Sequence, residues 1–157
     1  MSREIVEVAE RTPQLIDRLL EVWEHSVRAT HLFLSDSEIM EIKAYVPQAL
    51  REVPHLVVAW SEDGLPTAFM GVDGQKLEML FLAPEERGKG LGKKFVQHGV
   101  KCYRIREVTV NEQNPQARGF YEHMGFQVYK RTDYDEQGNP YPLLYMSRTQ
   151  KPMENLD

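Results

Sequence analysis

Closely spaced glycines and basic residues in the second half of the sequence are its clearest candidates for binding chemistry. The segment reads Arg87-Gly88-Lys89-Gly90-Leu91-Gly92-Lys93 and lies between an apolar run and a stretch with helical spacing. Glycines let a backbone approach a ligand without Cβ clashes. Free N–H groups at a helix N-terminus, together with the helix dipole, favour a bound phosphate. This glycine turn therefore predicts a phosphate-binding site; a solvated helix face is the alternative for its basic residues.

Two common phosphate-binding loops do not fit the glycine turn. A Walker A loop needs Ser or Thr two residues after its last glycine, but Lys94 stands two residues after Gly92. A dinucleotide fingerprint, Gly-x-Gly-x-x-Gly, can begin at Gly88 and Gly90, but its third glycine position holds Lys93. These mismatches argue against a P-loop nucleotide enzyme and against a Rossmann dinucleotide site.

The strands that must position this turn follow from apolar runs and turn signals. Asp63-Gly64 and Asp73-Gly74 separate three successive runs, and Asp-Gly between apolar runs is typical of a hairpin. A helix separates the runs 77–82 and 107–111, and such a crossover predicts a right-handed parallel pair. The predicted strands are residues 4–8, 55–60, 66–72, 77–82, 107–111, 126–131 and 143–146.

About four helices are predicted between these strands. Thr12 precedes Pro13 as the N-cap of the first. Ser35 and Glu38 form a capping box for the second, which is predicted to end at Pro47. The inward residues of the second helix are predicted to be Ile39, Ile42 and Val46. The third helix follows the glycine turn, and the fourth covers residues 115–124. The fold class is therefore α/β (α+β), a mixed and mostly antiparallel sheet of about seven strands.

Composition excludes several classes of protein. The 157 residues, 41% apolar and 27% charged, suit one globular domain, predicted over residues 1–150 with a polar tail at 151–157. No apolar run approaches the length of a membrane span. The lone Cys102 excludes an intrachain disulfide, so a cytoplasmic protein is expected. The net charge of −5 argues against nucleic-acid binding. His25, His31 and Cys102 lack ligand-pair spacing, so no metal site is expected.

Two motifs in this order resemble those of the GNAT superfamily of N-acetyltransferases. Arg87-x-x-Gly90-x-Gly92 resembles the Gln/Arg-x-x-Gly-x-Gly/Ala loop with which these enzymes hold the pyrophosphate of acetyl-CoA. Downstream, Asn111-x-x-Asn114-x-x-Ala117-x-x-Phe120-Tyr121-x-x-x-Gly125-Phe126 resembles the second family signature. The segment Trp23-x-x-Ser26-Val27-x-Ala29-Thr30-His31-x-Phe33-Leu34 also looks like the YjaB-like bacterial branch. The resemblance implies an acetyl-CoA-dependent N-acetyltransferase with direct transfer in a ternary complex.

The resemblance also implies roles for individual residues. The strands 77–82 and 107–111 would splay apart and admit the acetyl-pantetheine arm of the cosubstrate. Backbone groups of Phe81 and Leu82 would then lack sheet partners and bind that arm, with the Leu82 N–H as oxyanion donor. Asn111 would bind the same arm, and Asn114 would cap the next helix or bind the cosubstrate. The expected pyrophosphate contacts are Arg87, Gly88, Lys89, Gly90, Gly92 and Lys93.

Tyr121 is the candidate catalytic acid. Attack of an amine on a thioester expels a thiolate, and a phenol that donates a hydrogen bond or a proton helps it leave. Tyr121 occupies the tyrosine position of the second signature, before Gly125-Phe126. The alternative is a core tyrosine whose hydroxyl is satisfied within the protein.

Glu78 is the candidate catalytic base, acting through water. Alternation along a strand places Glu78 on the face of Leu80 and Leu82, whereas Leu77 shares the other face with Met79. A carboxylate among apolar neighbours on a central strand is unusual, and desolvation would raise its pKa. The alternative is an exposed glutamate near the end of a strand.

The acceptor amine is the least determined part of the reaction. In the family, the segment between the first two helices covers the acceptor side, which here is residues 25–35. His31 and Phe33 are therefore candidate substrate contacts, and the expected partner is a small-molecule or peptide amine. A homodimer is a further expectation. The alternative function is a catalytically weak GNAT-fold module that binds or senses acyl-CoA.

Overall fold

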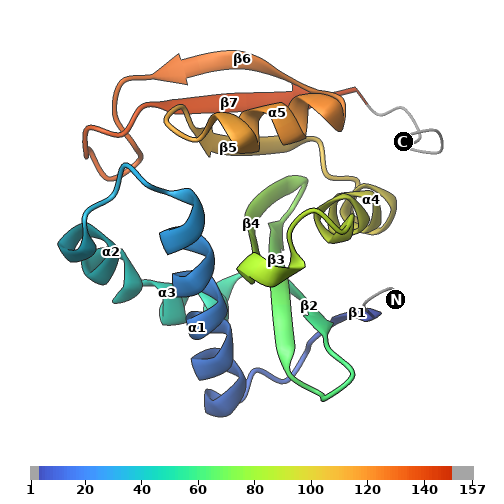
Figure 1. The fold of residues 1–157 in the computed structure, drawn as a ribbon. Coiled ribbons are helices and arrows are strands. Elements are labelled where there is room, and N and C mark those ends of the chain that lie inside the picture. Colours follow the sequence, from blue (N-terminus) through green and yellow to red (C-terminus); the bar gives the residue numbers. More distant parts are fainter. Residues whose placement is uncertain (1–3, 150–157) are drawn as a thin grey trace.

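A seven-stranded sheet flanked by helices makes up the protein in a computed structural model that describes residues 4–149 (Figure 1). The predicted tail, residues 151–157, lies outside this range. The strands are β1 (Glu4–Glu7), β2 (His55–Trp60), β3 (Pro66–Asp73), β4 (Lys76–Leu82), β5 (Glu107–Asn111), β6 (Phe126–Thr132) and β7 (Leu143–Arg148). The helices are α1 (Pro13–Thr30), α2 (Asp36–Lys43), α3 (Val46–Glu52), α4 (Leu91–Tyr103), α5 (Pro115–His123) and a 3-10 turn, η1 (Pro84–Glu86).

The order of strands in the sheet is β1-β2-β3-β4-β5-β7-β6, and β4 and β5 are its parallel pair. These two strands pair only at Lys76 with Glu107 and at Leu77 with Val108. Beyond Leu77 they diverge, and in Figure 1 the strands β5, β7 and β6 stand apart from β1–β4. The predicted mixed sheet with a splayed parallel pair at its centre is therefore confirmed.

Two apolar cores hold the helices on the sheet. The α1-side core is formed by α1, α2 and α3 against one face, and the α4-side core by α4 and α5 against the other. Each large apolar side chain stabilises the folded state by about 1.5–3 kcal/mol when it is fully buried. The two cores together therefore hold the diverging strands in place. Fully buried members include Ile16, Leu19, Leu50, Leu56 and Phe69 in the first core and Met70, Phe95, Ile105, Phe126 and Met146 in the second.

An irregularity in β4 changes which face its residues occupy. Gly71 of β3 is opposite Met79, but the next residue, Val72, is opposite Leu77, so Glu78 has no partner on β3. Two residues against one is the pattern of a β-bulge. The prediction that Leu77 shares a face with Met79 is wrong, because the extra residue shifts the alternation by one. Leu77 packs in the α4-side core, and Met79 packs in the α1-side core.

The second predicted helix is divided into α2 and α3. Pro47 does not end a helix; it lies in the first turn of α3, where proline is tolerated because that N–H has no helical partner. Ile39 and Val46 are buried as predicted, but Ile42 is 37% exposed. The prediction that Ile42 faces the core is therefore wrong. The N-cap at Thr12 is confirmed by its hydrogen bond from the Leu15 N–H.

The start of α2 depends on Ser35. Its hydroxyl accepts from the Glu38 N–H at 3.2 Å, and the Glu38 carboxylate accepts from the Ser35 N–H at 2.8 Å, which confirms the predicted capping box. We expect Ser35→Ala to lower the free energy of unfolding by about 1 kcal/mol in urea titrations. Ser35→Asp, which keeps an acceptor, should lose much less. Equal losses in the two variants would contradict a capping role.

Candidate active site

A cavity of about 490 Å³ lies where β4 diverges from β5. Its walls come from the C-terminal part of α1, the end of β4, the glycine turn with the start of α4, and one face of α5. The arrangement brings together segments that are up to 95 positions apart in the sequence. The lining residues are Ser26, Thr30, His31, Leu80, Phe81, Leu82, Arg87, Gly88, Gly90, Leu91, Gly92, Lys93, Asn114, Gln116, Ala117, Phe120 and Tyr121.

The glycine turn forms one wall of the cavity. Gly88 (φ +76°) and Gly90 (φ +81°) are left-handed, which other residues rarely adopt, and no atom lies within 4 Å of where their Cβ atoms would stand. Gly92 is needed for a different reason, because a Cβ there would meet the Phe120 ring at 3.3 Å. Gly90 caps α4 without a side-chain hydrogen bond. The first N–H groups of α4 have no carbonyl partner within the helix, so the turn suits a phosphate.

The basic residues of the turn differ in their positions. Arg87 lines the cavity and its Nη2 donates to Gln116 Oε1 of α5 at 2.7 Å. Lys93 lines the cavity too. Lys89 is not among the lining residues; its Nζ lies 3.9 Å from Glu86, a carboxylate that is only 2% exposed. Arg87 and Lys93 therefore face the cavity, whereas Lys89 lies beside the turn.

The end of β4 presents peptide groups to the cavity. The Ala83 N–H donates to the Thr67 carbonyl at 2.8 Å, so Ala83 is a hydrogen-bonded position opposite β3. Such positions alternate in antiparallel pairs, and the peptide groups of Leu82 and Leu80 therefore point away from β3 into the gap. Those of Phe81 face β3, opposite Phe69. The prediction that Phe81 has unpaired backbone groups is wrong; its side chain lines the cavity instead.

Tyr121 lies on α5 at the cavity wall. It is 6% exposed and packs edge-on against the rings of Phe120 and Phe126, at 5.0 and 5.6 Å between centroids. Burial raises the pKa of the Tyr121 phenol above its ordinary value. The phenol is therefore protonated throughout the neutral range and available as a hydrogen-bond donor.

The two asparagines of the second signature lie at the turn before α5. Asn114 Oδ1 accepts from the Ala117 N–H at 3.2 Å, so Asn114 caps α5, and it also lines the cavity. Asn111 ends β5, where it pairs with Leu143 of β7. Asn111 is not among the residues that line the cavity, so the structure does not bring it to Leu82 and Tyr121.

Glu78 lies in a second cavity of about 350 Å³. Thr109, Asp135 and Glu136 line the same cavity, and the Glu78 carboxylate is 3.8 Å from Lys76 Nζ. Burial raises the pKa of Glu78, and the Lys76 charge opposes the shift. The buried Thr109 hydroxyl has no hydrogen-bond partner among residues 4–149. The structure thus separates Glu78 from the cavity that holds Leu82 and Tyr121.

His31 and Phe33 lie on the loop between α1 and α2. His31 lines the larger cavity, whereas Phe33 does not. The Phe33 ring stands between His31, at 5.6 Å, and Tyr141 of the β6–β7 loop, at 6.0 Å between centroids. Burial lowers the pKa of the His31 imidazole. The aromatic contact therefore joins the α1–α2 loop to the β6–β7 loop.

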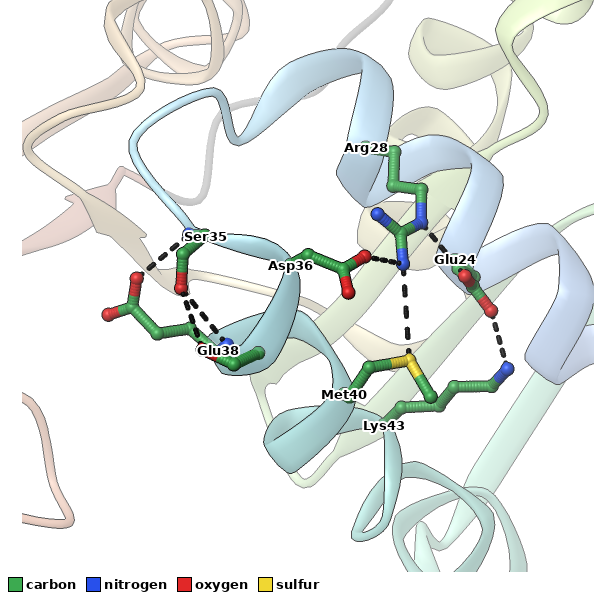
Figure 2. A network of polar contacts seen from close by, with 8 residues as sticks. Glu24, Arg28, Ser35, Asp36, Glu38, Met40 and Lys43 are labelled. Atoms are coloured by element: carbon green, nitrogen blue, oxygen red, sulfur yellow. Dashed lines mark hydrogen bonds and ion pairs between the residues drawn. The ribbon is translucent and has the colours of Figure 1, made fainter.

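A network of charged side chains connects α1 and α2, the two helices at the ends of the loop that carries His31 and Phe33. Figure 2 shows Arg28 of α1 between Glu24 of the same helix and Asp36 of α2, with both carboxylates 2.8 Å away. Glu24 also pairs with Lys43 at the end of α2, and the two hydrogen bonds lower the pKa of Glu24. Each exposed pair is weak alone, but together they fix α2 against α1 and thereby the ends of the loop.

Seven residues that line the cavity were not among the predicted site residues: Ser26, Thr30, Leu80, Leu91, Gln116, Ala117 and Phe120. Ser26 and Thr30 lie one helical turn apart, and a polar pair at that spacing beside an apolar stripe was the available signal. Among the described residues no group of three or more His, Cys, Asp or Glu could hold a metal ion. No helix between residues 4 and 149 is long and apolar enough to cross a membrane.

The splayed sheet, the glycine turn and the cavity between them define a class of protein. A family model described as the acetyltransferase (GNAT) domain matches residues 32–141. The chain therefore belongs to the GNAT family and is an acetyl-CoA-dependent N-acetyltransferase, as the resemblance implied. The alternative of a module that binds acyl-CoA without catalysis is not kept.

Particular relatives agree with this class. The chain is similar to the peptidyl-lysine N-acetyltransferase YjaB of Salmonella typhimurium, with 42% identity over 128 residues, 82% of this chain and 88% of that protein. The Escherichia coli YjaB is 41% identical over 131 residues, 83% and 88% of the two chains. The solution structure of apo YjaB from Escherichia coli superposes with a TM-score of 0.84 at 38% identity, over 95% of this chain and 99% of that one. The predicted YjaB-like branch is confirmed.

A more distant structure shares the fold. The PaiA N-acetyltransferase of Thermoplasma acidophilum, solved in complex with coenzyme A, has a TM-score of 0.70 at 22% identity, over 95% of this chain and all of that one. The residues of this chain fit the cosubstrate of the family on their own geometry. Arg87 and Lys93 provide cations, the left-handed glycines leave open space, and β4 presents free peptide groups to the gap.

Proposed function

We propose that the acceptor is the side-chain amine of a lysine in a protein or peptide. The observation that carries this proposal is the similarity, over 82–83% of the chain, to two peptidyl-lysine N-acetyltransferases. The structure supports it in one respect. Glu78, Asp135 and Glu136 line the second cavity, and carboxylates attract the ammonium group of an approaching lysine.

Each end of the larger cavity has a proposed role in the transfer. The glycine turn, with Gly88, Gly90 and Gly92, holds the pyrophosphate, and Arg87 and Lys93 neutralise it; Lys89 adds charge from beside the turn. The Leu82 N–H donates to the thioester oxygen as negative charge develops there. Tyr121 donates a proton to the departing sulfur. Asn114 fixes the start of α5, which carries Tyr121.

The acceptor proposal is tested with the full-length chain, acetyl-CoA and a panel of peptides that contain one internal lysine. We expect thiol release with these peptides and a single added acetyl group, located on the lysine by mass spectrometry. The matched control replaces that lysine by arginine and should be inert. Release of CoA with small amines alone would overturn the peptidyl-lysine proposal and leave the N-acetyltransferase activity intact.

Cosubstrate binding is measured separately by calorimetric titration with acetyl-CoA, with ATP and NAD as controls. We expect a micromolar dissociation constant for acetyl-CoA and no measurable binding of the other two, because the glycine turn fits neither of their loops. Stronger binding of ATP than of acetyl-CoA would contradict the assignment of the turn.

A further inference from the structure

The acceptor amine needs a base, and the larger cavity offers few. A lysine amine has a pKa near 10.4, so it reaches the enzyme as an ammonium ion that must lose a proton before it attacks. The residues that line the cavity, all within the described range 4–149, include no aspartate and no glutamate. Its ionisable members are Arg87, Lys93, Tyr121 and His31. Of these, the His31 imidazole alone accepts a proton near neutral pH.

The hydrogen bonds of His31 determine which ring nitrogen is free. The Thr30 hydroxyl lies 2.8 Å from the Ser26 carbonyl and 2.8 Å from His31 Nδ1. A carbonyl can only accept, so the single hydroxyl proton goes to Ser26. The hydroxyl oxygen must then accept from Nδ1–H. The neutral ring therefore carries its proton on Nδ1 and keeps the lone pair of Nε2, to which the described residues make no hydrogen bond.

The surroundings of His31 keep this ring neutral. Burial lowers the pKa of His31 below its ordinary value. The charged groups that share the cavity are Arg87 and Lys93, and both would further disfavour an imidazolium. α5 contributes the protonated Tyr121 to the cavity wall, and β4 contributes three apolar residues. The nearby carboxylates Glu24 and Asp36 are engaged with Arg28.

We propose that His31 Nε2 is the base that removes the proton from the acceptor ammonium. The inference rests on the proposed transfer to an amine in this cavity. The ammonium gives one proton to Nε2, which later passes it to solvent. The nitrogen lone pair then forms the N–C bond with the thioester carbonyl. When the C–S bond breaks, its electron pair stays on sulfur, which takes a proton from Tyr121. The phenolate recovers its proton from the new amide nitrogen through solvent.

Glu78 is the competing base, and the structure favours His31 on position. Glu78 lies in the second cavity, where its carboxylate faces Lys76 and Glu136. His31 shares one cavity with Leu82, whose peptide N–H marks the reacting carbonyl, and with Tyr121. Glu78 is absent from the lining of that cavity, whereas His31 is part of it.

The test compares His31→Asn with the wild type and with His25→Asn. Asparagine keeps an N–H donor for the Thr30 hydroxyl but has no basic nitrogen. His25 is an exposed residue of α1 that does not line the cavity. At pH 7 we expect His31→Asn to lower kcat roughly 100-fold, with an unchanged dissociation constant for acetyl-CoA. The loss in kcat relative to the wild type should become smaller as pH rises, because the amine then loses its proton in solution. It should also be smaller with acceptor amines of low pKa. His25→Asn should behave as wild type.

Three outcomes would overturn the inference. One is a His31→Asn variant whose pH–rate profile matches wild type. Another is a Glu78→Gln variant that loses the acidic limb of the profile while His31→Asn keeps it. The third needs no acceptor: nitrogen NMR of the neutral His31 ring should show a protonated Nδ1 and a bare Nε2, and the opposite tautomer would contradict the proposal. Inactivity of the wild type towards every lysine peptide would instead remove the proposed acceptor and leave the NMR result to decide on His31.

Discussion

Tyr121→Phe is expected to lower kcat at least tenfold, and by roughly 100-fold if the phenol transfers a full proton, while acetyl-CoA affinity changes little. The hydroxyl acts on the sulfur only as the C–S bond breaks, so its loss is confined to the transition state. Burial raises the pKa of the phenol, so the acid form persists to high pH. Steady-state kinetics with saturating acetyl-CoA measures kcat, and calorimetry measures binding of the cosubstrate.

The variant also separates catalysis from packing. Phenylalanine keeps the ring that packs edge-on against Phe120 and Phe126, so the melting temperature should stay close to that of the wild type. Tyr45→Phe is a matched control, because Tyr45 is 72% exposed in the turn between α2 and α3. Unchanged turnover of Tyr121→Phe would remove Tyr121 from the mechanism and return it to the role of a core tyrosine.

The sequence predicted those parts of the site whose conformation depends on short, continuous segments of the chain. Gly88 and Gly90 need left-handed backbone whatever surrounds them, and Tyr121 follows Asn114 within one helix. Such features depend on residues that are close together in the chain, so their spacing can be recognised in the sequence. The splay between β4 and β5 was predictable as well, although from resemblance to the family rather than from the strands' own composition.

The parts that the sequence did not predict depend on three-dimensional contacts. The bulge at Glu78 comes from the pairing of β3 with β4, and no residue type marks it, so strict alternation put Leu77 on the wrong face. Glu78 lines a cavity together with residues of the β6–β7 loop and not the cavity that holds Tyr121, a placement that strand alternation does not give. The tautomer of His31 required the positions of Ser26 and Thr30 relative to the ring, which residue spacing alone does not give.

Gly88→Asp is expected to weaken acetyl-CoA binding by roughly 100-fold, and its partner variant Gly88→Asn by no more than a few-fold. Asn and Asp are the two side chains that best tolerate the left-handed backbone of Gly88. No atom lies within 4 Å of a Cβ at this position, so neither substitution is expected to displace the turn. The two variants have nearly the same shape and differ by one negative charge.

That charge is the basis of the prediction. A carboxylate about 5 Å from a phosphate is repelled by about 3 kcal/mol at an effective dielectric constant of 20, and each 1.4 kcal/mol is about tenfold in affinity. Calorimetric titration at low and high salt measures the effect, and the gap between the variants should narrow with salt because the turn is partly open to solvent. Equal affinities for the two variants would mean that no phosphate lies at Gly88, and that the pyrophosphate assignment of the turn is wrong.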